Sequence, residues 1–134
     1  MAESGGNETQ LTRNGGVTPV ESVDRKWVYY KKGQGLWRIP ATGGEEIQVI
    51  DRIGHQLNYA VVEKGIYFLD AVGTKNLTLY YFDFATRMVT PLLETGKSAT
   101  PLPMGLAISP DRRWIVFPLW DRFDSDLMLV ENFR

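Results

Sequence analysis

The sequence predicts an all-β fold built from repeated antiparallel sheets, and three observations support this prediction. Short β-branched and aromatic runs are separated by Gly, Pro, Asn and Asp at intervals of about eight to twelve residues, which is strand and turn spacing. One strand pattern occurs three times, at Lys26–Tyr30, Lys64–Phe68 and Arg113–Phe117. The apolar runs are nearly continuous, which is typical of sheets covered on both faces.

The spacing of the three copies indicates the size of the repeating unit. Trp27, Gly65 and Trp114 hold equivalent positions and lie 38 and 49 residues apart, near the length of a four-stranded propeller blade. Such a unit cannot bury its apolar faces alone and is stabilised by stacking on its neighbours. We therefore expect β-propeller blades, about three four-stranded antiparallel sheets that form a partial or half propeller.

The elements follow in order along the chain. Residues 1–8 are small and polar and are expected to be disordered, while residues 9–134 form the partial propeller. A lone strand is expected over residues 10–13, belonging to a neighbouring or closing blade. The blades are expected over residues 19–50, 59–93 and 106–133. The third blade is expected to lack its outer strand, because the chain reaches Arg134 where that strand should begin.

Composition excludes several classes of function. With 15 Lys and Arg against 16 Asp and Glu, the formal charge of −1 provides no basic field, so nucleic acid is not an expected partner. The absence of cysteine excludes disulfides and thiolate metal sites. No apolar run is long enough for membrane insertion, and residues 1–10 cannot serve as a secretory leader. The compartment stays open: cytoplasmic as written, periplasmic if a leader is missing.

Two turns carry a resemblance to a known family. Ser22-Val23-Asp24-Arg25-Lys26 and Ser109-Pro110-Asp111-Arg112-Arg113 each precede an apolar strand. They resemble the Ser-Pro-Asp-Gly-Lys turn of six-bladed TolB-like propellers, which are built from WD-repeat-like (PD40-type) blades. The resemblance covers roughly Thr9 to Arg134. It is to the C-terminal three blades of bacterial proteins whose propeller follows a signalling or DNA-binding domain.

The residues of these turns also have a structural role that can be stated without the family resemblance. Ser22, Asp24, Ser109 and Asp111 carry short side chains that accept hydrogen bonds from nearby backbone amides, and Pro110 fixes φ at the turn entry. The family's glycine is replaced by arginine at positions 25 and 112. We therefore do not expect a positive φ at either position.

Few residues are candidates for chemistry. Asp121, Asp124 and Asp126 alternate on one loop and could offer oxygens to calcium, but the loop lacks a glycine and a bidentate Glu, and Arg122 opposes a cation. A solvated hairpin loop is the favoured interpretation. His55 is the only histidine and falls in a linker, and no nucleophile elbow is present. No catalytic, cofactor-binding or metal-binding residue is therefore assigned, and no cofactor is expected.

The predicted function is a non-catalytic platform for a protein or peptide partner, within a larger bacterial signalling or envelope protein, as the resemblance implies. The alternative is the accessory propeller of an enzyme, of the serine peptidase or sugar lyase type, with its catalytic centre outside this chain. A third reading is a gene remnant that makes no stable product.

Half a ring leaves the first and last blades each with a bare apolar face. Exposing about four bulky residues on each face forgoes about 10 to 20 kcal/mol in total, as much as the net stability of a domain. Two remedies are open: the chain is a piece of a longer polypeptide, or it forms a homodimer that completes a six-bladed ring. The abrupt polar start favours the first.

Overall fold

The computed structural model describes residues 6, 8–53, 59–70, 76–98, 105–121 and 124–131. All secondary structure in these ranges is β-strand, arranged in three antiparallel sheets, which confirms the all-β fold class. Most of residues 1–8, expected to be disordered, lie outside the described residues. In the described part of the chain there is no helix that could cross a membrane.

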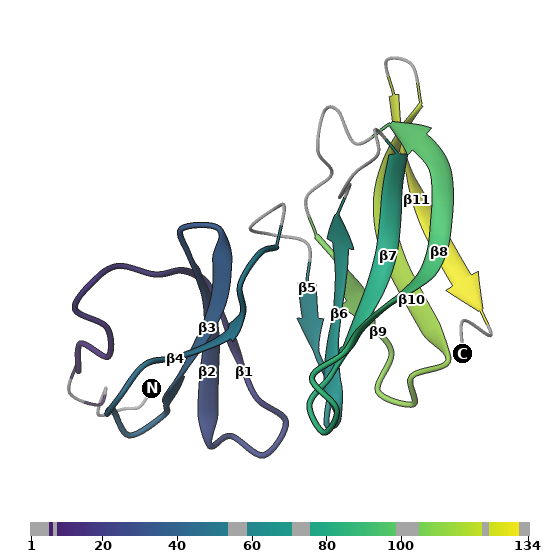
Figure 1. Ribbon diagram of the computed structural model, residues 1–134. Helices are drawn as coiled ribbons and strands as arrows, with labels where there is room; N and C mark the ends of the chain where they lie inside the picture. Colours follow the sequence, from purple (N-terminus) through teal and green to yellow (C-terminus); the bar gives the residue numbers. More distant parts are fainter. Residues whose placement is uncertain are drawn as a thin grey trace.

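Each sheet is formed by consecutive strands (Figure 1). The first sheet contains β1 (Val17–Glu21), β2 (Trp27–Lys32), β3 (Gly35–Pro40) and β4 (Ile47–Ile50). The second contains β5 (Tyr59–Val61), β6 (Gly65–Asp70), β7 (Asn76–Asp83) and β8 (Val89–Ser98). The third contains β9 (Ala107–Ile108), β10 (Trp114–Asp121) and β11 (Asp124–Glu131), in the order β11-β10-β9.

The sheets stack face to face, and each seam between them has its own apolar core. Tyr29 and Leu36 of the first sheet meet Ile66, Phe68 and other residues of the second in one buried cluster. A separate cluster joins the second sheet to Ile115 of the third. The innermost strands contact one another in series, β1 with β5 and β5 with β9, as expected of wedges around an axis.

Within the described chain residues 10–13 belong to no strand, and the first strand begins at Val17, so the pairing of residues 10–13 with a neighbouring or closing blade stays a prediction. A strand exists only where it can pair with a free edge, and no strand of the described chain pairs with this segment. Leu11, Thr12 and Gly16 instead lie over the outer face of the first sheet, where they line a pocket with Tyr30. Tyr30 is only 2% exposed, so part of this end face is covered within the chain, and the pocket beside it is open.

Arg38 in β3 illustrates how the pairing register assigns residues to faces. Arg38 lies opposite Tyr29, so both side chains point toward the second sheet. Val28 and Ile39 also pair and point to the outer face. The seam between the first two sheets therefore receives a charged side chain from β3 as well as apolar ones.

Candidate binding pocket between the first two sheets

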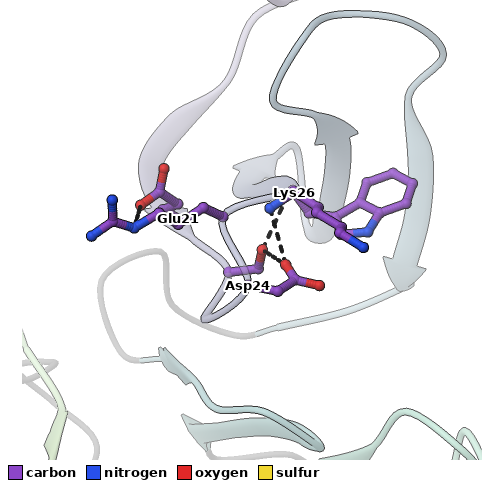
Figure 2. Close-up of polar contacts among 6 residues, drawn as sticks. Glu21, Asp24 and Lys26 are labelled. Carbon is purple, nitrogen blue, oxygen red and sulfur yellow. Dashed lines mark hydrogen bonds and ion pairs between the residues drawn. The ribbon is translucent and has the colours of Figure 1, made fainter.

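The turn from Ser22 to Lys26 is closed by its own side chains (Figure 2). Ser22 Oγ donates to Asp24 Oδ1 at 2.6 Å, and the same carboxylate oxygen accepts the Lys26 amide at 3.0 Å. Ser22 Oγ also accepts the Trp27 amide at 3.0 Å. The side chains therefore supply partners to two backbone donors that the turn would leave open.

The third sheet repeats this arrangement. Ser109 Oγ donates to Asp111 Oδ1 at 2.6 Å and accepts the Trp114 amide at 3.0 Å, while Asp111 accepts the Arg113 amide at 3.1 Å. Pro110 lies within the same turn. The second sheet lacks such a cap and closes its turn through the Val62 amide, which donates to the Gly65 carbonyl at 2.9 Å.

The arginines in these turns correct one expectation from the sequence. Arg25 has φ 62° and Arg112 has φ 59°, so both occupy the left-handed region that we did not expect there. The hydrogen bonds from their amides to the carbonyls of Ser22 and Ser109, both at 2.9 Å, hold the backbone in this conformation. The turn geometry is therefore preserved without its glycine, at the cost of backbone strain.

The hydrogen bonds also shift the titration of the two aspartates. The Ser22 hydroxyl and then the Lys26 amide lower the pKa of Asp24 below its usual range. The Ser109 hydroxyl and the Arg113 amide lower the pKa of Asp111 in the same way. Each hydrogen bond favours the ionised carboxylate, so both turns are charged at neutral pH.

A pocket of about 280 Å³ opens at the seam beside the first turn, and we call it the seam pocket. Its walls come from the β1–β2 turn, β2, β3 and the turns after β5 and β7. They are formed by Ser22, Val23, Asp24, Trp27, Tyr29, Arg38, Val62, Glu63 and Phe84. Both sheets that form the pocket lie within the described chain, so its walls need no further blade.

Aromatic rings and one cation dominate the interior of the seam pocket. The Arg38 guanidinium lies 3.9 Å from the centre of the Trp27 ring, a cation–π contact that fixes its position. Tyr29 stacks on Phe84 with ring centres 5.9 Å apart, which joins the two sheets. Burial raises the pKa of the Tyr29 hydroxyl, and the neighbouring Arg38 partly opposes that shift. The pocket thus offers flat apolar surfaces and a fixed positive group.

The residues singled out from the sequence are distributed unequally. Ser22 and Asp24 border the seam pocket, whereas Ser109 and Asp111 lie in the third sheet, away from it. Asp121 and Asp124 pair at the end of the β10–β11 hairpin, but their side chains and that of Asp126 lie outside the described residues.

His55 likewise falls outside the described residues. Among the side chains that are described, no group of acidic or histidine residues could hold a metal ion. Sequence reasoning did not identify three residues of the seam pocket, Arg38, Glu63 and Phe84, because only the pairing register and the stacking of sheets bring them together.

Comparison with solved structures identifies the architecture. TolB from Acinetobacter baumannii superposes with a TM-score of 0.72 at 15% identity, over 89% of this chain and 30% of that one. A structure assigned to TolB from Agrobacterium tumefaciens gives a TM-score of 0.65 at 18% identity, over 83% and 40% of the two chains. This chain has the fold of part of a TolB-like β-propeller.

The TolB-like sheets of this chain correspond to less than half the length of either solved structure. At such low identity the likeness establishes the fold alone. Neither a protein-family model nor a curated protein sequence matches the chain.

Proposed function

We propose that this chain is a non-catalytic propeller segment that binds a protein or peptide partner at the seam pocket. The observation that supports this most directly is the pocket itself, which places Trp27, Tyr29 and Phe84 around a fixed Arg38. Aromatic residues and arginine are the residue types that contribute most of the binding energy at protein interfaces. The role also agrees with the one that the family resemblance implies.

The size of the pocket indicates what it receives. At about 280 Å³ it is smaller than most pockets for drug-sized ligands, which span about 300 to 1,000 Å³, and it suits one side chain of a partner. Asp24 and Glu63 at the pocket wall give polar contacts to the partner's backbone. We therefore propose recognition of an exposed loop or an extended peptide that inserts a single side chain.

The enzyme alternative receives less support. None of the residues that line the seam pocket is a histidine, cysteine or lysine, so its serine, Ser22, has no such base beside it. Ser22 Oγ is also committed to Asp24 and to the Trp27 amide. Catalysis would need a centre outside the pocket, as the sequence-based alternative assumes.

Peptide selection tests this proposal. Peptides selected from a random phage-displayed library on the wild-type chain should bind with an affinity that Arg38→Gln weakens at least about tenfold, measured by fluorescence polarisation. Glu63→Lys changes the exposed pocket wall without disturbing the core and should also alter binding. Arg52→Gln removes an exposed charge outside the pocket and is the matched control. The proposal fails if no peptide is enriched, or if all three variants bind the selected peptides as the wild type does.

A further inference from the structure

The outer face of the third sheet is apolar and exposed. In β10, Ile115 and Phe117 are buried against the second sheet, so the alternate residues Trp114, Val116 and Pro118 point outward. Leu129 and Leu127 of β11 pair with Val116 and Pro118 and share that face. These two leucines are 53% and 76% exposed. We call this set of five residues the third-sheet face.

The third sheet also has an open edge. Strand β11 pairs with β10 on one side, and no other described strand pairs with it. In the first two sheets the outer edge of the third strand pairs with a fourth strand, β4 or β8. The backbone groups along β11 thus offer a template for one more antiparallel strand.

The first sheet presents a complementary surface. Its outer face has an apolar pocket of about 250 Å³, lined by Val28, Tyr30 and Ile39 from the sheet and by Thr9, Leu11, Thr12, Gly16 and Pro19 from the N-terminal side. Thr9, Leu11 and Thr12 line this pocket, and in the described part of the chain residues 9–13 belong to no strand. One face of the chain therefore offers protruding leucines and a strand edge, and the opposite face offers an apolar hollow and an unpaired segment.

We propose that two copies of this chain associate, with the third-sheet face of each copy stacked on the outer face of the first sheet of the other. The contact would continue the stacking already seen twice within the chain, from first to second sheet and from second to third. Residues 10–13 of each copy would then pair with the open edge of β11 in its partner. Each copy uses both surfaces once, so the dimer closes with two-fold symmetry and leaves neither surface exposed.

A second copy is the occupant favoured by the structure because it carries both halves of the contact. Leu127 and Leu129 are exposed on one face of the chain, and the apolar hollow beside Leu11 and Val28 lies on the opposite face, so one sequence supplies both halves of the contact. This association is independent of the seam pocket, which lies on the opposite face of the first sheet.

The mass of the full chain in solution tests the proposal. Sedimentation equilibrium of the wild type at micromolar concentration should give twice the chain mass of 15.2 kDa. The double variant Leu127→Glu and Leu129→Lys should sediment as a monomer and keep its β-sheet circular dichroism, because both side chains are exposed. Met88→Glu changes an equally exposed apolar residue in the β7–β8 turn and should remain a dimer.

Hydrogen exchange separates this dimer from other associations. The amides of residues 10–13 should be protected in the wild type and should lose that protection in the double variant. A folded wild-type monomer overturns the proposal, and so does polydisperse aggregation. A dimer that survives the double variant, or one that Met88→Glu dissociates, also overturns it, because association would then use another surface.

Discussion

Replacing Arg25 with glycine is expected to stabilise the protein, although it removes a charged side chain. The backbone of Arg25 has φ 62°, a conformation that costs an L-residue about 1 to 2 kcal/mol and costs glycine almost nothing. Relief of this strain is the gain from Arg25→Gly, and the greater conformational freedom of glycine in the unfolded chain offsets about 0.5 to 1 kcal/mol of it.

The loss of the ion pair between Arg25 and Glu21 reduces the expected stabilisation only slightly further. Arg25 Nε lies 3.8 Å from Glu21 Oε1, with side chains 84% and 58% exposed, and such surface pairs contribute about 0.3 kcal/mol. The net gain is therefore about 0.5 kcal/mol for Arg25→Gly. Arg112 has the same backbone conformation in a different sheet, so the two changes should add to about 1 kcal/mol and raise Tm by about 3 to 5 °C.

Urea unfolding of the single and double variants measures this gain. Lys26→Gly is the matched control, because Lys26 is exposed, adjacent, and not among the residues with positive φ. The control should lose about 0.5 to 1 kcal/mol, a change of opposite sign. If Arg25→Gly loses as much stability as Lys26→Gly, the strain assigned to this turn does not exist.

Three further perturbations test other parts of the structure. Gly65→Ala should cost about 3 kcal/mol of unfolding free energy, because an added Cβ would lie 2.2 Å from the Phe82 carbonyl oxygen. Gly96→Ala should cost only about 1 kcal/mol, because Gly96 has φ +70° but open space around it. Equal losses in urea unfolding would contradict this difference. Tyr59→Phe should cost about 1 to 2 kcal/mol, since its hydroxyl donates across the first seam to the Thr18 carbonyl, and an unchanged unfolding midpoint would show that this bond contributes nothing. The lowered pKa of Asp24 and Asp111 adds stability that is present at neutral pH and is lost as the pH falls through the pKa values of the folded protein. The difference in unfolding free energy between the wild type and the Asp24→Asn/Asp111→Asn variant should therefore narrow from about pH 7 to about pH 3. A difference that stays constant over this range would exclude the linkage.

The repeated sheets could be predicted from the sequence because each strand carries its own local signal. The runs around Trp27, Ile66 and Trp114 are short, β-branched or aromatic, and bounded by turn residues, so strand and turn agree without long-range information. The Ser22 and Ser109 turns are local for the same reason, since each closes within five residues.

The errors came where distant contacts decide the outcome. Nothing near Arg25 in the sequence shows that the hydrogen bonds of the turn would hold an arginine at positive φ. Residues 10–13 were expected to join a neighbouring or closing blade, and such pairing depends on a free sheet edge that lies far away in the sequence or outside the chain. The seam pocket combines residues from Ser22 to Phe84, and their proximity depends on how two sheets stack.

The second sheet lies between two separate apolar cores, so the stability of both cores depends on it. Loosening either outer sheet opens one core, whereas disordering the middle one opens both at once. The slowest-exchanging amides should therefore map to β6 and β7, and damage at either end should stay local until it reaches them.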